Sequence, residues 1–238
     1  MNLRRNRSIQ CVDLGLIDYK QAWDYQTSLF EKNIAIKSAN RLLAEDQQSP
    51  TDNFLLFCEH PHVYTLGKSG KPEHLLVNDS QLATLNASYY HINRGGDITY
   101  HGPGQIVVYP VIDLENFFTD IHRYMRFLEE SVIRTCEYFG VSAGRVEGLT
   151  GVWVDHMDAT RARKICALGV KTSRWVTMHG LAFNVNTNLD YFRHIVPCGI
   201  HDKAVTSLAV ETGATHDLKT VGDVLRQSLC DVFEMEVV

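Results

Sequence analysis

Apolar side chains recur every three or four residues in three parts of this chain, which is the spacing of a helix that buries one face. Three helices are predicted from this spacing: one capped by Asp18 with its apolar stripe over 22–34, one over 121–139 that Gly140 ends, and one from Thr220 to Phe233. Each of them is expected to pack its stripe against a shared core.

Between these helices lie short runs rich in β-branched and aromatic residues, which lack the helical spacing and are typical of strands. The runs cover 54–57, 63–66, 106–114, 151–155, 164–172 and 175–185. Several are joined by short connections, which favours antiparallel pairing. We therefore predict an α+β fold in which helices pack on a mixed, largely antiparallel sheet. No linker, repeat or low-complexity tract divides residues 1–238, so a single domain is expected.

The composition narrows the class of protein. Of the 238 residues 45% are apolar and 21% charged, and the net charge of −5 gives no basic surface that would gather nucleic acid. No apolar run is long enough to cross a bilayer, so no membrane partner is expected. Six cysteines are spread along the chain without Cys-X-X-Cys pairing, which fits reduced thiols in the cytoplasm. His60 and His62 lack a third ligand at diagnostic spacing, so a turn is favoured over a metal site.

One stretch departs from the overall charge. Arg161, Arg163, Lys164, Lys171 and Arg174 lie together without an acidic residue among them. Such a stretch either attracts an acidic partner or forms a solvated strand face, and the sequence favours neither interpretation.

The segment from Arg94 to Pro110 combines four glycines with a basic residue and a histidine, and it runs into a β-branched strand. Glycine has no Cβ, so such a loop lets a ligand come close to the backbone while the strand holds the loop in place. The alternative is a tight hairpin at a sheet edge.

Cys198 differs from the other five cysteines in its neighbours, because Pro197 and Gly199 favour a turn that projects the side chain. A thiol with a pKa near 8.5 is only about 3% ionised at neutral pH, so a nucleophilic role requires an activator. A histidine or a lysine would serve, and an ammonium about 4 Å away is worth roughly 4 kcal/mol before desolvation is subtracted. Lys164, at the head of a strand, is the candidate lysine. Cys166 is the rival nucleophile, but its regular strand predicts a buried, inert thiol.

Several segments, taken in order, resemble the signature blocks of the lipoyl(octanoyl) transferases, also called octanoyl-[acyl-carrier-protein]:protein N-octanoyltransferases. The similar segments are 59–67, 94–105, 164–170, 179–185, 197–199 and 205–208. The resemblance covers about residues 54 to 210 and implies a fold related to the catalytic module of biotinyl and lipoyl protein ligases. One departure is Asp97, where many relatives have glutamine, and a carboxylate near an acyl channel would change the local polarity.

The resemblance also implies an acyltransferase activity and a set of partners. Cys198 would take an octanoyl group from acyl carrier protein as a thioester, and the ε-amine of a lysine on a lipoyl domain would attack that thioester. Lys164 would hold the thiolate and then manage protons. The implied acceptors are the lipoyl domains of 2-oxoacid dehydrogenase complexes and the glycine cleavage H protein, and no metal or cofactor is implied.

Three segments are implied to bind substrate, and their backbone N–H groups are candidates for stabilising a tetrahedral oxyanion. They are Arg94, Gly95, Gly96, Asp97, Ile98, Thr99, Tyr100 and His101; Ala167, Leu168 and Gly169; and Gly180, Leu181 and Ala182. Two other functions remain open. An ATP-dependent lipoate or octanoate ligase of the same fold would also use Lys164 but needs no thiol, so Cys198 distinguishes it. A non-catalytic module that holds octanoyl or lipoyl groups would need neither residue.

Overall fold

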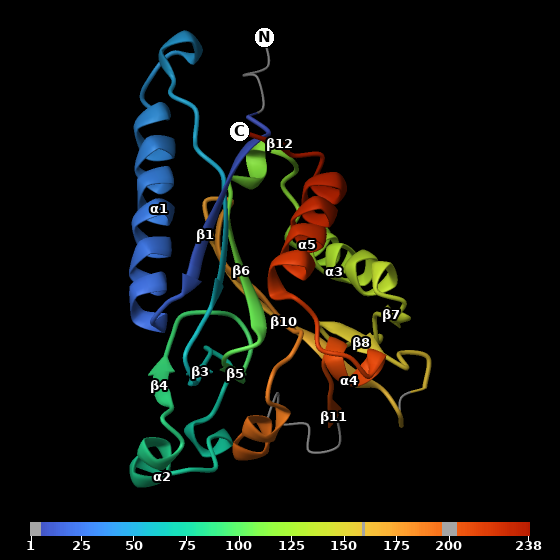
Figure 1. Ribbon diagram of the computed structural model, residues 1–238. Helices are drawn as coiled ribbons and strands as arrows, with labels where there is room; N and C mark the ends of the chain where they lie inside the picture. Colours follow the sequence, from blue (N-terminus) through green and yellow to red (C-terminus); the bar gives the residue numbers. More distant parts are fainter. Residues whose placement is uncertain (1–5, 159, 197–203) are drawn as a thin grey trace.

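The computed structural model describes residues 6–158, 160–196 and 204–238 (Figure 1). The first half contains β1 Ser8–Leu16, α1 Tyr19–Asn40, β2 Phe54–Glu59, β3 Val63–Leu66, α2 Asp79–Thr84, β4 Ser88–His91, β5 Ile98–His101 and β6 Gln105–Val111. The second half contains α3 Ile121–Tyr138, β7 Ala143–Gly144, β8 Val152–Val154, β9 Arg163–Ser173, β10 Val176–Asn184, β11 Ala204–Val205, α4 Leu208–Thr212, α5 Leu218–Phe233 and β12 Glu236–Val237. Short 3₁₀ turns cover Glu45–Gln47, Pro72–His74, Leu114–Asn116 and Leu189–His194.

Two sheets organise the described residues. The main sheet has the strand order β12-β1-β2-β6-β10-β9-β8-β7, and β11 pairs with β9 beside this path. Along the sheet, each neighbouring pair in the path β2-β6-β10-β9-β8-β7 is antiparallel. The pairs β1 with β2, β1 with β12, and β11 with β9 are parallel. The small sheet has the order β4-β3-β5. The predicted mixed, largely antiparallel sheet of an α+β fold is therefore confirmed.

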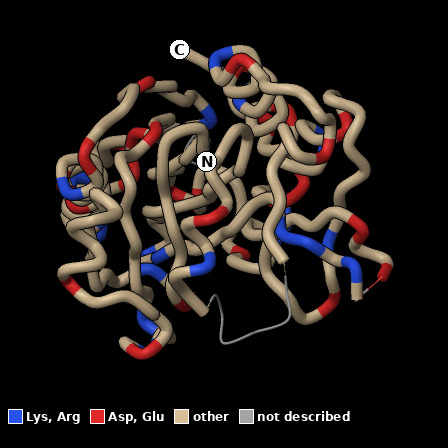
Figure 2. Tube along the Cα trace, turned by 60° about the horizontal axis from the view of Figure 1, so that its bottom comes forward, with Lys and Arg blue, Asp and Glu red and all other residues tan. Residues whose placement is uncertain are grey.

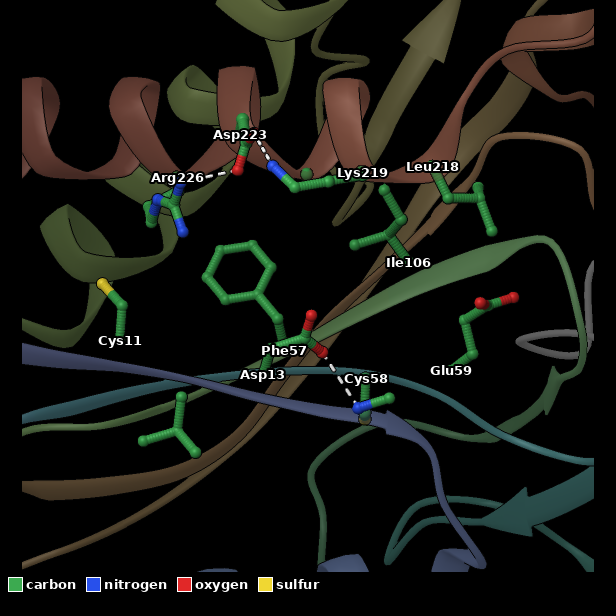
Figure 3. Close-up of a pocket in the computed structure, with 13 residues that line it drawn as sticks. Cys11, Asp13, Phe57, Cys58, Glu59, Ile106, Leu218, Lys219, Asp223 and Arg226 are labelled. Atoms are coloured by element: carbon green, nitrogen blue, oxygen red, sulfur yellow. Dashed lines mark hydrogen bonds and ion pairs between the residues drawn. The ribbon is translucent and has the colours of Figure 1, made fainter.

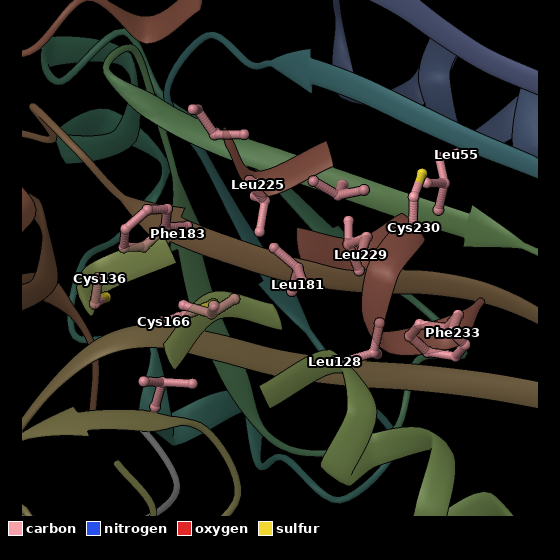
Figure 4. Packing of buried hydrophobic residues seen from close by; sticks show 14 of the residues in the cluster. Leu55, Leu128, Cys136, Cys166, Leu181, Phe183, Leu225, Leu229, Cys230 and Phe233 are labelled. Atoms are coloured by element: carbon pink, nitrogen blue, oxygen red, sulfur yellow. The ribbon is translucent and has the colours of Figure 1, made fainter. Parts of the chain in front are cut away.

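Helices cover both faces of the main sheet (Figure 1). On one face α1 buries Ala22 and Phe30 against strand residues that include Val107 and Ala182. On the other face α3 and α5 form the larger core, in which Leu128, Leu225 and Leu229 pack on Leu181 and Phe183 (Figure 4). The main sheet is thus buried between two helical layers, as a sheet with apolar residues on both faces requires.

The predicted helices are present, with one corrected boundary. Asp18 caps α1 by accepting hydrogen bonds from the backbone N–H groups of Lys20 and Gln21. The last helix begins at Leu218 rather than at Thr220, because Asp217 is its N-cap and accepts from the N–H of Thr220 at 2.9 Å. Thr220 is therefore already inside the helix.

The strands also differ in places from the prediction. The strand expected over 106–114 ends at Val111, because Asp113 accepts from the N–H of Glu115 and starts a 3₁₀ turn. Strand β1 precedes the first helix and was not predicted, and neither were β4, β5 and β12. Within the described residues, no helix is both long and apolar enough to span a membrane.

Candidate active site

A cavity lies on the α1 face of the main sheet, where β5 approaches β6 and β10. Its walls come from four strands, the start of α1 and the loop before β5. The residues that line it are Tyr19, Arg94, Thr99, His101, Val107, Tyr109, Ala167, Leu168, Gly169, His179, Gly180, Leu181 and Ala182. Apolar and glycine positions of β6, β9 and β10 form one side, which suits a chain of methylene groups.

The Arg94 side chain fixes the glycine loop at the rim of this cavity. Its guanidinium donates to the carbonyl oxygens of Gly95 and Asp97, both at 2.7 Å, and to that of Thr65 at 3.2 Å. The N–H of Gly95 donates to the carbonyl of Val170 at 3.0 Å, which joins the loop to β9. This N–H is therefore already used within the fold, which argues against it as an oxyanion donor.

Two glycines allow the strands to approach at the cavity. A Cβ on Gly180 would lie 2.1 Å from the carbonyl oxygen of Val108 on the neighbouring strand. A Cβ on Gly169 would lie 2.7 Å from Nη1 of Arg94 and 2.8 Å from the carbonyl oxygen of Gly95. Glycine is thus required at both positions for steric reasons, and the sequence signal of a glycine-rich site has a structural cause.

His101 and His179 line the cavity as neutral side chains. Burial lowers the pKa of each to about 3, and the neighbouring charges of His60 on His101 and of Arg94 on His179 act in the same direction. Nδ1 of His101 lies 2.8 Å from Oε1 of Gln105, and Nε2 of His179 lies 3.2 Å from Oδ1 of Asn93. His101 is therefore both a buried, hydrogen-bonded histidine and a cavity residue.

His179 has a further unusual feature, a φ of 60° that is rare outside glycine. Strained backbone of this kind clusters at functional sites. His179 begins the segment 179–185 that resembles the family, but it was not among the residues implied to bind substrate, and the structure places it in the cavity wall.

Lys164 lies on β9, three residues before Ala167, and is not among the residues that line the cavity. Its Nζ lies 4.6 Å from the ring centroid of Trp153 on the neighbouring strand. Its Cε lies close to Gly151, because a Cβ added to that glycine would be 3.2 Å from it. The parallel pairing of β11 with β9 places Val205 opposite Lys164. The rival nucleophile Cys166 is buried, and burial raises the pKa of its thiol well above the ordinary value.

Cys198, the predicted nucleophile, lies outside the described residues. The chain is described up to Val196, whose N–H donates to the carbonyl of His74 at 2.8 Å, and again from Ala204 onward. Of the fourteen residues implied to bind substrate, nine meet around the cavity: Arg94, Thr99, His101, Ala167, Leu168, Gly169, Gly180, Leu181 and Ala182. The remaining five, Gly95, Gly96, Asp97, Ile98 and Tyr100, are not part of its lining.

Asp97 has a role within the protein that the sequence did not suggest. One carboxylate oxygen accepts from the N–H of Ile98 at 2.6 Å and the other lies 2.6 Å from Nδ1 of His74. The carboxylate therefore joins the loop before α2 to the glycine loop rather than facing the cavity.

The basic stretch does not act as one patch. Arg163 forms ion pairs with Asp155 at 2.5 Å and with Glu211 at 2.6 Å, and Arg161 lies 3.3 Å from Asp155. Lys171 lies over the ring of Phe30. Basic and acidic positions are interspersed along the trace (Figure 2). Two of the five basic side chains thus form ion pairs with acidic residues, of which Asp155 is nearby in the sequence and Glu211 is far away.

Four of the lining residues were not among those that the sequence analysis assigned to substrate binding: Tyr19, Val107, Tyr109 and His179. Tyr19 belongs to the buried face of α1, and Val107 and Tyr109 alternate along β6. Alternation alone would have put the two β6 residues on one face, but only the fold shows which face holds the cavity.

The fold is that of the lipoate protein ligases. The lipoate protein ligase of Thermoplasma acidophilum, solved in a study with its E2 lipoyl domain, superposes with a TM-score of 0.67 over 98% of this chain and 86% of that protein, at 15% sequence identity. A sequence identity of 15% shows the fold alone. The superposition confirms the prediction that the fold is related to that of lipoyl protein ligases.

Sequence comparison then gives the family. The model of the lipoyl protein ligase A/B catalytic domain matches residues 18–230. The chain is 59% identical to the octanoyltransferase of Cytophaga hutchinsonii over 100% of this chain and 97% of that protein. It is 56% identical to the octanoyltransferase of Flavobacterium johnsoniae over 98% of this chain and 100% of that protein. The chain belongs to the lipoyl protein ligase A/B catalytic domain family.

Proposed function

We propose that this protein is an acyltransferase that moves an octanoyl group from acyl carrier protein to the ε-amine of a lysine on lipoyl domains. The observation that carries this proposal is the identity of 56% and 59% to octanoyltransferases over nearly the whole length of both chains. The cavity supports it, because nine residues that the resemblance assigned to substrate binding line one mostly apolar space.

In the first step the Cys198 thiolate attacks the carbonyl carbon of the octanoyl thioester on the carrier protein. A new C–S bond forms to Cys198, and the carrier's thiolate leaves and takes up a proton. In the second step the neutral ε-amine of the acceptor lysine attacks the Cys198 thioester. An amide forms, the Cys198 thiolate is released, and the surplus proton of the amine is transferred away.

Lys164 is assigned to stabilising the thiolate and to handling this proton. The length of the chain allows the contact: Ala204 follows Cys198 by six positions, and β11, which starts at Ala204, pairs with the part of β9 that carries Lys164. Six residues reach at most about 20 Å when fully extended. An ammonium in contact with the sulfur favours the ionised thiol, which is the nucleophilic form.

The cavity is assigned to the octanoyl chain. The two histidines of the lining are neutral, so Arg94 is its one charged side chain. The guanidinium of Arg94 is already hydrogen-bonded to three carbonyl groups. An eight-carbon chain packed along Val107, Ala167 and Ala182 would be stabilised by about 0.8 kcal/mol for each buried methylene group.

An ATP-dependent ligase of the same fold is the alternative, since the structural relative from Thermoplasma acidophilum is a lipoate protein ligase. The presence of Cys198 and the much higher identity to octanoyltransferases favour the transferase. The acceptor lipoyl domains and the cytoplasmic location remain predictions. The predicted location rests on the cysteines, which are spread along the sequence without Cys-X-X-Cys pairing.

The choice of acyl donor tests the proposal. The purified protein is incubated with a lipoyl domain and either octanoyl-acyl carrier protein or octanoate with ATP and Mg²⁺, and the mass of the lipoyl domain is followed. Octanoylation is expected with the carrier-protein donor alone. Modification only with octanoate and ATP would replace the transferase by the ligase, and no modification with either donor would remove both.

A further inference from the structure

Four buried polar side chains form a continuous network between the cavity assigned to the octanoyl chain, called the acyl cavity below, and the backbone of Lys164. They come from β5, β6, β10 and the position after β11. The four are His101, Gln105, Asn184 and Thr206, which are 6%, 1%, 4% and 1% exposed. Burying polar groups is costly unless they are hydrogen-bonded, so the bonds within this set, called the polar network below, determine how the four segments lie together.

The two central members of the polar network lie on the face of the sheet that holds the acyl cavity. Gln105 and Asn184 are paired across β6 and β10. Ile106, the next residue on β6, points into a separate hollow between β1 and α5 (Figure 3). Because successive side chains of a strand point to opposite faces, Gln105 shares its face with Val107, which lines the acyl cavity. The two amides thus lie on the cavity side of the sheet.

The turn between β5 and β6 is fixed in the same region. Glu59, which also lines the hollow in Figure 3, accepts from the N–H of Gly104 at 2.7 Å. The carbonyl oxygen of Gly104 accepts from the N–H of Asn186 at 2.8 Å. A Cβ on Gly104 would lie 2.7 Å from the carbonyl oxygen of Asn186, so the turn lies directly against the chain that follows β10. The backbone between His101 and Gln105 is therefore held in place from two sides.

Carbonyl groups set the direction of the hydrogen bonds in the polar network. The carbonyl oxygen of Thr206 can only accept, so the amide nitrogen of Asn184 donates to it, at 3.0 Å. Oδ1 of Asn184 then accepts from Nε2 of Gln105 at 2.9 Å, and the same nitrogen donates to the carbonyl oxygen of Tyr100 at 3.2 Å. Oε1 of Gln105 is left to accept from Nδ1 of His101 at 2.8 Å. His101 is therefore held as the tautomer with its proton on Nδ1.

At its other end the polar network reaches Lys164. The N–H of Thr206 donates to the carbonyl oxygen of Lys164 at 2.9 Å. The hydroxyl of Thr206 donates to Glu211, whose carboxylate forms an ion pair with Arg163 at 2.6 Å. The N–H, carbonyl and hydroxyl groups of Thr206 are thus all bonded within the fold, two of them to groups at the start of β9. Asn184 therefore connects this end of β9 to the acyl cavity.

We propose that Asn184 is a positioning residue for the acyl transfer proposed above, on which this inference rests. Its amide holds Thr206, and through Thr206 the backbone of Lys164, in register with the acyl cavity. Asn184 is not among the residues that line the cavity, so it acts through the others. A displacement of reacting groups by about 1 Å can lower a rate roughly 100-fold, so a modest shift of Lys164 would be visible in the kinetics.

The test compares Asn184→Ala with Asn33→Ala, a matched control on α1. Asn33 is 1% exposed, and its amide forms two hydrogen bonds with the backbone of Asp52, at 2.8 and 3.2 Å. Both variants thus lose a buried amide with two bonds. Asn184→Ala should lower kcat for octanoyl transfer about tenfold or more and keep KM for octanoyl-acyl carrier protein within about twofold, whereas Asn33→Ala should keep both. Equal kcat values in the two variants overturn the inference.

The pH dependence of Cys198 alkylation separates positioning from a loss of stability. If the ammonium of Lys164 moves away from the thiol, the rate of alkylation by iodoacetamide should rise at higher pH in Asn184→Ala than in the wild type. Asn33→Ala should keep the wild-type profile. Identical profiles in the two variants, with octanoyl transfer by the wild type intact, overturn the inference and leave the proposed function standing. A wild type that transfers no octanoyl group removes the proposed function, and this inference with it.

The tautomer of His101 tests the polar network in the wild type, so it does not depend on whether Asn184→Ala folds. Nitrogen–proton correlation spectra are recorded on protein labelled at the histidine nitrogens, and His101 is assigned by comparison with His101→Gln. A proton on Nδ1 is expected. A proton on Nε2 would require both amides to be reversed, which would turn Oδ1 of Asn184 towards the carbonyl oxygen of Thr206 and remove the bond on which the inference depends.

Discussion

Replacing Gly169 by alanine tests how the acyl cavity is built. The added Cβ would lie 2.7 Å from Nη1 of Arg94, 2.8 Å from its Cδ and 2.8 Å from the carbonyl oxygen of Gly95. Arg94 would have to move, and its bonds to the carbonyl groups of Gly95 and Asp97 would be weakened or lost.

The size of the effect follows from those contacts. A hydrogen bond with a charged partner contributes about 1.5–3 kcal/mol. Two such bonds would be lost, and relaxation of the structure would recover part of their energy. The free energy of unfolding should therefore fall by about 2–4 kcal/mol. For a chain of this length that corresponds to a decrease in Tm of roughly 5–15 °C. Because Arg94 and Gly169 both line the cavity, kcat/KM for octanoyl-acyl carrier protein should fall by about tenfold or more.

The assay compares urea unfolding and octanoyl transfer in Gly169→Ala with the same measurements in Gly222→Ala. Gly222 lies in α5, and the nearest atom to an added Cβ is Cδ1 of Ile106 at 3.9 Å. This control should gain about 0.5–1 kcal/mol of stability and keep wild-type kcat/KM. Wild-type stability and kinetics in Gly169→Ala would refute the role given to Arg94.

Three other outcomes are expected. Lys164→Met should raise the pKa of the Cys198 thiol, so the rate of its alkylation by iodoacetamide should rise at higher pH than in the wild type; an unchanged profile would leave the ion pair without support. Burial lowers the pKa of His101 and His179 to about 3, so the unfolded chain takes up protons below about pH 6.5 while the folded chain does not. The free energy of unfolding should therefore have its full value above pH 6.5 and should be lower by about 2 kcal/mol per histidine at pH 5. In urea titrations, His179→Gln should show a smaller decrease between these two pH values than the wild type. Arg174→Glu should slow transfer from the acidic carrier protein at low salt, and a rate equal to wild type would separate the basic stretch from donor recognition.

The sequence predicted most of the elements that carry strong patterns. The stripe on α1 and its Asp18 cap are local features, and the β-branched runs of β6, β9 and β10 lie at the centre of the sheet. Strand β1 escaped prediction because it lies near the sheet edge, half-exposed, and because its place depends on parallel pairing with β2, which no local pattern encodes.

Nine of the residues that the sequence analysis assigned to substrate binding line one cavity, but their arrangement in space was not predicted. Glycines at 169 and 180 marked the cavity because steric crowding leaves no room for a Cβ. The pairing of Asp97 with His74 and of Arg163 with Glu211 joins residues far apart in the sequence, so the polarity of the glycine loop and of the basic stretch could not be read from it.

The acyl-enzyme is the central claim of the proposed function, and its mass tests that claim most directly. The protein is mixed with octanoyl-acyl carrier protein, quenched in acid and digested, and the peptide that contains Cys198 is weighed. The account predicts one octanoyl group on Cys198 of the wild type and none at this position in Cys198→Ser. When a lipoyl domain is added, the octanoyl group should leave Cys198 as the amide forms on the lipoyl domain. An unmodified Cys198 peptide during active turnover, or an adduct that persists in Cys198→Ser, would contradict the thioester route.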